Sequence, residues 1–200
     1  MQASLLRSSL CRLILKFLPP DIIQSTTLLS LSPPFAMTDT LRNDGLYIVL
    51  YLTSFMQEQK FHWALYHHYR QTGDATQGYR YHIRTVGPGW IADHGPNSGV
   101  MGSFSLITVV YIGTISQAHV NQVATHASQF DAQLNQIPSM TCRVWTMMVL
   151  QSLVNGHLLR VGGTVDQIEA EMKEIGAEHE NNAHLNVQPR PIRTSKYAIL

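Results

Sequence analysis

The fold is decided by the stretch Leu46-Tyr47-Ile48-Val49-Leu50-Tyr51-Leu52. An unbroken apolar run of this kind is typical of a strand that is buried on both faces of a sheet. We therefore expect the folded domain to begin near Leu46, with a strand in its core.

Three more strands are predicted farther along the chain, over residues 61–66, 79–85 and 104–112. Residues with turn-forming side chains lie between the first two of these, at 71–74 and 77–78. Because such residues favour chain reversal, we expect the two strands to form an antiparallel hairpin with a longer loop.

Residues 87–103 contain five glycines and two prolines and show no period. They predict a long loop, and loops of more than about 12 to 15 residues are often functional. A plain surface connection that Trp90 pins to the core is the alternative. The sequence leaves both interpretations open.

The second half of the chain predicts helices. Apolar side chains recur at spacings of three and four within residues 120–134, 145–153 and 165–175, which places an apolar face of each helix on a core. Asn155-Gly156 predicts the end of the middle helix. The predicted fold class is therefore α+β, a small antiparallel sheet packed against three helices.

The sequence predicts one domain, over residues 43–185, between two segments of different composition. Residues 186–200 are rich in Asn, Pro and Arg and are expected to run as an extended tail over the surface. Residues 1–42 hold basic side chains among leucines and serines, and prolines interrupt them. A disordered extension, a mitochondrial transit peptide and translation from Met37 are all compatible with this composition.

Composition and charge limit the partners. Charged residues make up 14% of the chain and the net charge is +1, so there is no basic excess to bind nucleic acid. The uncharged run at residues 22–37 is shorter than the roughly 20 apolar residues of a membrane-spanning helix. We expect no membrane span and a monomeric protein.

The two cysteines, Cys11 and Cys142, cannot build a disulfide framework. A lone thiol in a domain is typical of a reducing compartment, so we expect a cytoplasmic protein, with mitochondria as the alternative given by the N-terminal segment. His67 and His68 are adjacent and expected to be solvated, and the remaining histidines lack the spacing of a zinc site. No metal and no cofactor are predicted.

Cys142 is the candidate nucleophile. Pro138, Ser139 and Thr141 precede it, and the two hydroxyl residues are N-cap candidates, so the thiol should lie in the first turn of the middle helix. The unpaired amides and the positive end of the helix dipole there favour the thiolate. We therefore expect a lowered cysteine pKa and backbone donors for an oxyanion.

Two strand histidines could serve this thiol. His62 opens the second strand and His82 lies in the third, so a hairpin could bring both imidazoles onto one face, toward the helix that begins at Cys142. A nucleophile needs a base that a third polar group orients. His94 and the adjacent Asp93, in the glycine-rich segment, are alternative third members.

Three short motifs carry a resemblance to a known family: Phe61-His62-Trp63-Ala64-Leu65-Tyr66, Tyr81-His82-Ile83 and Thr141-Cys142-Arg143-Val144-Trp145. Their order resembles the circularly permuted, NlpC-type branch of the papain-like fold, which includes lecithin retinol acyltransferase-like and PPPDE proteins. The chain also resembles uncharacterised fungal proteins with the same layout. The family resemblance implies a permuted papain-like domain with His62 as general base, His82 as its orienter and Cys142 as nucleophile.

The predicted function is a cysteine-dependent hydrolase or acyltransferase. It would act on an amide, thioester or ester bond of a small-molecule or peptide substrate, through an acyl-enzyme on Cys142. A catalytically inactive binding or scaffold domain on the same fold is the alternative, and a regulatory redox thiol is a third interpretation.

Overall fold

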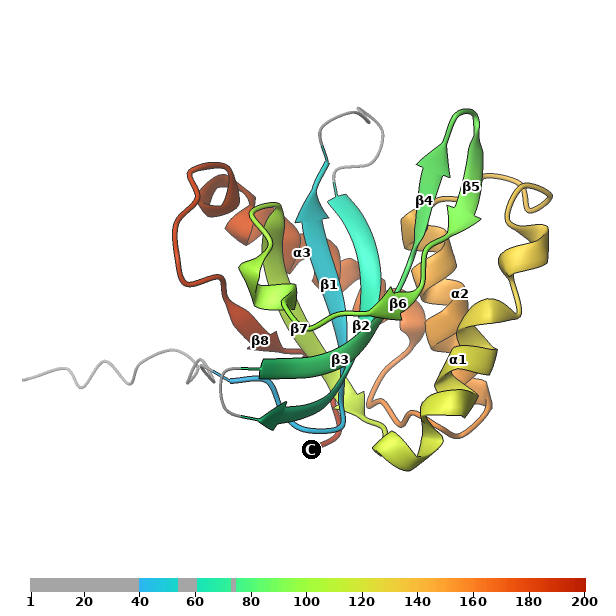
Figure 1. Cartoon of the computed structure of the whole chain (residues 1–200), viewed down its shortest axis with the longest axis horizontal. Helices are drawn as coiled ribbons and strands as arrows, with labels where there is room; N and C mark the ends of the chain where they lie inside the picture. The colour runs from blue at the N-terminus through green and yellow to red at the C-terminus, as the bar shows by residue number, and fades with distance from the viewer. Residues whose placement is uncertain (1–39, 54–60, 73–74) are drawn as a thin grey trace, which may run out of the picture. The chain divides into compact units, whose positions relative to one another are not determined.

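Six strands form one curved sheet in the order β6-β3-β2-β1-β7-β8 (Figure 1). The structure is a computed structural model and describes residues 40–53, 61–72 and 75–200, all within one unit that spans residues 37–200. The strands are β1 (Gly45–Leu52), β2 (Phe61–Thr72), β3 (Ala75–Tyr81), β6 (Gly95–Pro96), β7 (Leu106–Thr114) and β8 (Ile192–Thr194). The N-terminal extension predicted over residues 1–42 lies, as far as residue 39, outside the described residues.

The apolar run at the start of the domain forms β1, between β2 and β7. Residues 46–50 are completely buried, as expected for a strand covered on both faces. Even-numbered side chains such as Ile48 pack into the larger core below the helices, and odd-numbered ones such as Val49 pack into a smaller core on the opposite face. The period of two therefore divides one strand between two cores.

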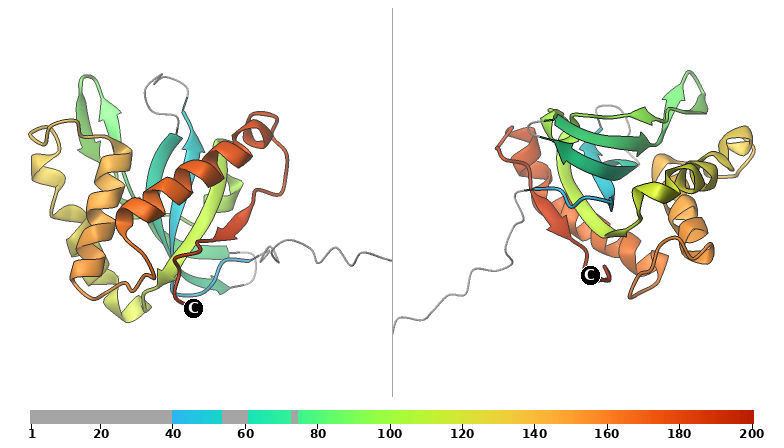
Figure 2. Two further views of the ribbon diagram at one scale, coloured as in Figure 1. Left: turned by 180° about the vertical axis from the view of Figure 1, so that it is seen from behind. Right: turned by 60° about the horizontal axis from the view of Figure 1, so that its bottom comes forward.

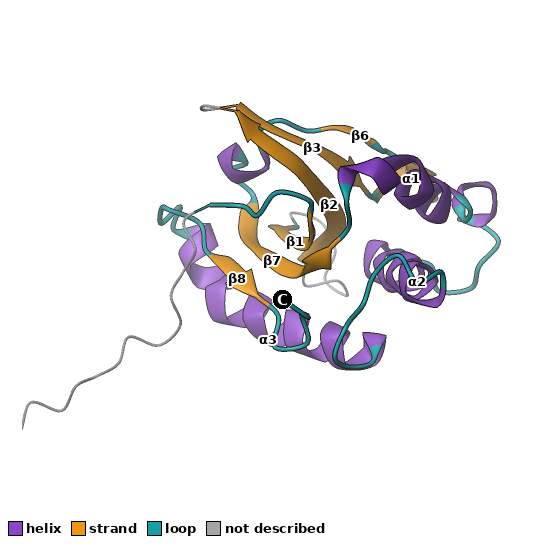
Figure 3. Ribbon diagram, turned by 90° about the horizontal axis from the view of Figure 1, so that it is seen from below, coloured by secondary structure: helices purple, strands orange, loops and turns teal. Residues whose placement is uncertain are grey.

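Three helices complete the α+β fold, and the predicted class is confirmed. They are α1 (Val120–Ser128), α2 (Cys142–Asn155) and α3 (Val165–His184), with short 3-10 turns η4 (Gln117–His119) and η5 (Asp131–Gln133) on either side of α1. Seen from behind, α3 crosses the strands, and α2 lies beside it (Figure 2). The view from below shows the curvature of the sheet and the helices along one side of it (Figure 3).

The helix boundaries follow local chemistry. A capping box starts α3, because the Thr164 hydroxyl accepts from the Gln167 amide while the Gln167 side chain accepts from the Thr164 amide. The helix then continues to His184, beyond the predicted stripe. Gly176 lets it approach the sheet, since a Cβ there would lie 2.6 Å from the Phe61 ring.

The predicted hairpin is confirmed, with corrections. β2 and β3 pair antiparallel from Thr72 and Ala75 up to Leu65 and Tyr81. The longer loop expected is wrong, since only residues 73–74 separate the strands, and residues 77–78 lie inside β3. The strand predicted over 79–85 is interrupted at His82. Beyond it, β4 (Ile83–Val86) leaves β2 and pairs with β5 (Gly89–Ala92) as a separate two-stranded sheet.

The long loop predicted over residues 87–103 is therefore wrong. It contains β5, β6 and the 3-10 turn η3 (Val100–Gly102). Gly87, with a φ of 57°, makes the turn from β4 to β5, so hairpin geometry requires this glycine. Trp90 is held partly through its backbone, since its N–H donates to Asn135 Oδ1 at 2.7 Å and its carbonyl accepts from Asn135 Nδ2 at 3.0 Å.

The end of the chain runs over the surface only in part: residues 186–189 are exposed, whereas Arg190 and Ile192 are buried. β8 pairs parallel with β7, so the sheet is mixed and larger than the small antiparallel sheet expected. Arg190 is 3% exposed, and its guanidinium donates to the carbonyls of Ala183 and Phe104, among others. The sequence suggested a polar tail because it does not reveal that the Arg190 guanidinium donates hydrogen bonds to backbone carbonyls at the end of α3.

Candidate active site

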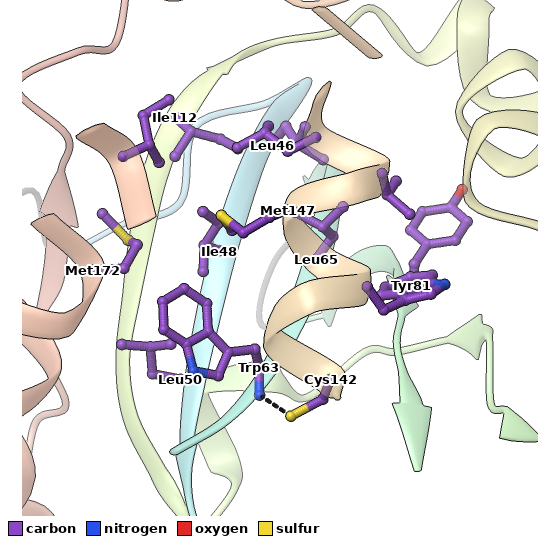
Figure 4. Close-up of a cluster of buried hydrophobic side chains, with 14 of the residues drawn as sticks. Leu46, Ile48, Leu50, Trp63, Leu65, Tyr81, Ile112, Cys142, Met147 and Met172 are labelled. Atoms are coloured by element: carbon purple, nitrogen blue, oxygen red, sulfur yellow. Dashed lines mark hydrogen bonds between the residues drawn. The ribbon is translucent and has the colours of Figure 1, made fainter. Parts of the chain in front are cut away.

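The candidate site lies where β3 separates from β2. On one side of β2, β1 pairs with residues 61–68. On the other side, β3 pairs with β2 only from Leu65 onward. The Cys142 sulfur lies at the edge left open by β3. It accepts from the Trp63 N–H at 3.4 Å (Figure 4). It also donates to the Phe61 carbonyl at 3.9 Å. The thiol therefore occupies the position of a missing strand partner.

Cys142 is the first residue of α2, as predicted. Thr141 is the N-cap, and its hydroxyl accepts from the Val144 N–H at 3.1 Å. That bond satisfies one of the four amides that a helix start leaves unpaired. The amides of Cys142 and Arg143 lie beside the sulfur and favour its thiolate form.

The predicted lowering of the cysteine pKa is nevertheless wrong for this structure. Cys142 is 2% exposed, and burial raises its pKa. The backbone amides of Trp63, Arg143 and Cys142 oppose this rise without overcoming it. Burial dominates because removing water penalises the charged sulfur more than a few amide dipoles stabilise it. The resting group is therefore a neutral thiol.

The two predicted histidines meet. Nε2 of His62 and Nδ1 of His82 lie 2.9 Å apart, and the rings are nearly perpendicular at 77°. Burial, helped by the nearby Arg80 guanidinium, lowers the pKa of His62 to about 4 and that of His82 to about 3. Both imidazoles are therefore neutral at pH 7, and only one hydrogen can lie between the two facing nitrogens.

The histidines share a face, but it is not the face that α2 covers. Phe61 and Trp63 point into the larger core, so His62 between them points to the opposite side, where its ring lies 6.0 Å from that of Tyr51. The prediction that both imidazoles face the helix is wrong in this respect. The sulfur is hydrogen-bonded to the β2 backbone at Trp63, and Cys142 packs in the larger core, on the side of the sheet opposite to the His62 ring. Among the described residues, no hydrogen bond joins it to either imidazole.

The carboxylate of Asp93 lies next to the His62–His82 pair. Asp93 Oδ2 lies 3.4 Å from His82 Nε2 and accepts from Arg84 Nε at 2.9 Å. The Asp93 N–H also donates to the His82 carbonyl at 2.9 Å, which closes the base of the β4–β5 hairpin. Of the two alternatives in the glycine-rich segment, Asp93 is the one beside the His82 ring.

His94 is hydrogen-bonded to the backbone of His82. Its Nδ1 accepts from the His82 N–H at 3.2 Å, and its Nε2 lies 3.4 Å from Asp131 Oδ1. Its ring packs against Trp145 at 5.3 Å between centroids. His94 therefore supports the break between β3 and β4. Its place, like that of Asp93, depends on a strand pairing that the sequence pattern does not show.

His67 and His68 are completely buried, which corrects the prediction that they are solvated. His67 Nε2 donates to the Ile115 carbonyl at 2.6 Å, and His68 Nδ1 lies 3.4 Å from the Tyr66 hydroxyl. Within residues 40–53, 61–72 and 75–200, no three potential ligands lie close enough to hold a metal ion. In the same ranges, no helix is both long and apolar enough to cross a membrane.

Residues 50–160 match the model of a family described as a family of unknown function (DUF6540). The chain belongs to this family. No curated protein and no solved structure matches it. The matched segment of this DUF6540 chain includes Cys142, His62, His82 and Asp93, so the whole candidate site lies inside the family's domain.

Proposed function

We propose that this DUF6540 protein is a cysteine-dependent hydrolase or acyltransferase that cleaves an amide, thioester or ester bond through an acyl-enzyme on Cys142. One observation carries the proposal. The Cys142 sulfur at the start of α2 accepts a hydrogen bond from Trp63 on β2, and the neighbouring residue His62 contacts His82 at the base of the β4–β5 hairpin. A thiol, a base and a group that orients the base are the parts of nucleophilic catalysis.

The proposed reaction has two steps. In the first, His62 Nδ1 takes the thiol proton while the sulfur attacks the substrate carbonyl carbon, and the amides of Cys142 and Arg143 receive the oxyanion. The intermediate collapses, the leaving group takes the proton from His62, and the acyl group remains on sulfur. In the second, His62 removes a proton from water or an acceptor alcohol or amine, which attacks the thioester and regenerates the thiol.

Both pKa shifts favour proton transfer at the moment of attack over a preformed ion pair. Burial raises the pKa of Cys142 and lowers that of His62 to about 4, so a neutral thiol and a neutral imidazole coexist over a wide pH range. Burial also requires the substrate to reach a sulfur that is 2% exposed. Catalysis through this site therefore includes an opening of the β2 edge.

Acyl transfer from an activated ester tests the proposal. We expect the full chain carrying Cys11→Ser to form an acetyl adduct with 4-nitrophenyl acetate, measured by intact mass and located on Cys142 by peptide mapping. Cys142→Ala in the same background is the control and should remove the adduct. Equal acetylation of both proteins, or none above that of unfolded chain, would contradict the proposal.

A catalytically inactive binding or scaffold domain is the second candidate. It is favoured by the burial of Cys142 and the rise of its pKa, both of which also describe a small core residue. This candidate expects the sulfur to react only when the chain unfolds. In that case the rate of modification should follow the concentration of denaturant.

The remaining expectations are proposed with the function. The permuted papain-like relationship is supported by the order of the parts, with the histidine strand first and the cysteine helix last. A small-molecule or peptide substrate is supported by the net charge of +1, which gives no attraction for nucleic acid. A cytoplasmic protein is supported by the single thiol of the described domain, Cys142, and a monomeric state stays a prediction.

A further inference from the structure

A line of ring nitrogens connects Asp93 to His62. Asp93 Oδ2 is 3.4 Å from His82 Nε2, and His82 Nδ1 is 2.9 Å from His62 Nε2. A neutral imidazole carries its hydrogen on only one nitrogen, and the other is an acceptor. The tautomer of one imidazole therefore constrains the tautomer of the other.

The direction of the line is set by the carboxylate. The 3.4 Å approach of Asp93 Oδ2 to His82 Nε2 is an ion-pair contact and not a hydrogen bond, and a negative charge beside that nitrogen favours an N–H there over a lone pair, so His82 gains from carrying its hydrogen on Nε2. His82 Nδ1 is then an acceptor, and His62 must place its own hydrogen on Nε2 to fill the 2.9 Å contact. His62 Nδ1 is left with a free lone pair.

We propose that Asp93 is a positioning residue that fixes the tautomers of His82 and His62, and so keeps His62 Nδ1 unprotonated as the base. Its effect on catalysis rests on the proposed function, whereas its effect on the tautomers does not. The opposite tautomers would place a hydrogen on His62 Nδ1, and the imidazole could not take the thiol proton from that side.

The fold holds Asp93 in place for this role. His82 and Asp93 face each other at the base of the β4–β5 hairpin, joined by the Asp93 N–H bond to the His82 carbonyl at 2.9 Å. Arg84 Nε donates to the same carboxylate oxygen that approaches His82, at 2.9 Å. Asn135 fastens the far strand of the hairpin at Trp90. A substitution of the Asp93 side chain leaves the backbone bond of the base intact.

Two other histidines provide references in the same molecule. His67 must carry its hydrogen on Nε2, because that nitrogen donates to the Ile115 carbonyl at 2.6 Å. His94 must carry its hydrogen on Nε2 as well, because its Nδ1 accepts from the His82 N–H. Asp131, which faces His94 at 3.4 Å, is thus a matched carboxylate that does not face the His62–His82 pair.

The tautomers can be measured directly by ¹⁵N NMR of histidine-labelled full chain at pH 7.5, with ring signals assigned by His62→Gln and His82→Gln. In the unmodified protein, we expect the Nε2–H tautomer for His62 and His82. Asp93→Ala should shift both toward Nδ1–H, and Asp93→Asn, which keeps an acceptor oxygen, should shift them less. Asp131→Ala should leave both unchanged.

The same variants separate this proposal from the proposed function. We expect Asp93→Ala to lower the rate of Cys142 acetylation by about 10- to 100-fold, and Asp131→Ala to change it little. Unchanged tautomers in Asp93→Ala, or a Nδ1–H tautomer of His62 in the unmodified protein, would overturn the positioning role even if acetylation occurs. A tautomer shift without any acetylation in the unmodified protein would support the positioning role and contradict the proposed function. The unmodified protein alone decides the tautomer if Asp93→Ala fails to fold.

Discussion

The two histidine pairs differ in the partners of their hydrogen bonds. His67 and His68 both lie on β2, whereas His62 lies on β2 and His82 lies between β3 and β4. His67 and His68 are completely buried, and His67 donates a hydrogen bond to the backbone carbonyl of Ile115. His62 contacts the imidazole of His82, which the Asp93 carboxylate approaches. The next residue, Trp63, donates its N–H to the Cys142 sulfur. Burial lowers the pKa of all of them. A lowered pKa is therefore common to both pairs and does not by itself identify a site, whereas the contact with a carboxylate distinguishes the His62–His82 pair.

The largest difference between the pairs should appear in chemistry. We expect His62→Ala to lower the rate of Cys142 acetylation by about 10²- to 10⁴-fold, since it removes the proposed general base. The measurement is intact mass against time in the Cys11→Ser background. A rate unchanged by His62→Ala would remove the distinction between the two pairs.

For stability, we expect a substitution of His67 to have a larger effect than the same substitution of His62. His67→Ala removes a buried ring and its bond to Ile115, and we expect it to reduce the free energy of unfolding by about 2–4 kcal/mol. His62 is only partly buried, so His62→Ala should reduce it less. Urea denaturation at pH 7 compares the two. A larger loss for His62→Ala would assign a structural role to the pair.

Acid should destabilise the fold through both pairs. Burial lowers the pKa of His62 to about 4 in the folded state, while the unfolded value is near 6.5. The unfolded chain therefore binds the proton first as pH falls. The contribution of His62 to the free energy of unfolding is fully present above pH 6.5 and is lost progressively down to pH 4. Over this range, we expect the free energy of unfolding to fall by roughly 2–3 kcal/mol because of this histidine.

Urea denaturation at pH 7.0, 5.5 and 4.5 measures this loss, and His62→Gln, which cannot titrate, is the control. The variant should lose less stability than the unmodified protein over this range. Equal slopes with pH for the two proteins would show that His62 does not titrate with a lowered pKa.

The smallest effect is expected at the start of α2. Thr141→Ala removes the N-cap bond to the Val144 amide and should cost about 1 kcal/mol of stability. Thr141→Ser keeps the hydroxyl and should cost less. Thermal unfolding of the three proteins ranks them, and equal midpoints would contradict the cap that positions Cys142.

The sequence predicts best where one local pattern determines the structure. The apolar run of β1 and the N-cap before Cys142 are local signals, and both elements form as expected. The separation of β4 from β2 at His82, and the parallel strand β8, depend on pairings with distant segments. Strand period alone does not encode them.

The candidate site follows the same division. Cys142 and the His62–His82 contact could be predicted, because a helix start and a hairpin place them. The contact with Asp93 could not, since it requires the β4–β5 pairing. The burial of His67 was missed because alternation places a residue on a face without saying whether that face is covered.

The pH dependence of Cys142 acetylation tests the central claim most directly. If neutral His62 takes the thiol proton during attack, the rate should be nearly constant from about pH 5 to pH 8 and should fall as pH drops through about 4, where His62 gains a proton. A rate that rises about tenfold per pH unit over the whole range from pH 5 to pH 8 would show an unassisted thiolate in equilibrium with a buried thiol, and would contradict the account.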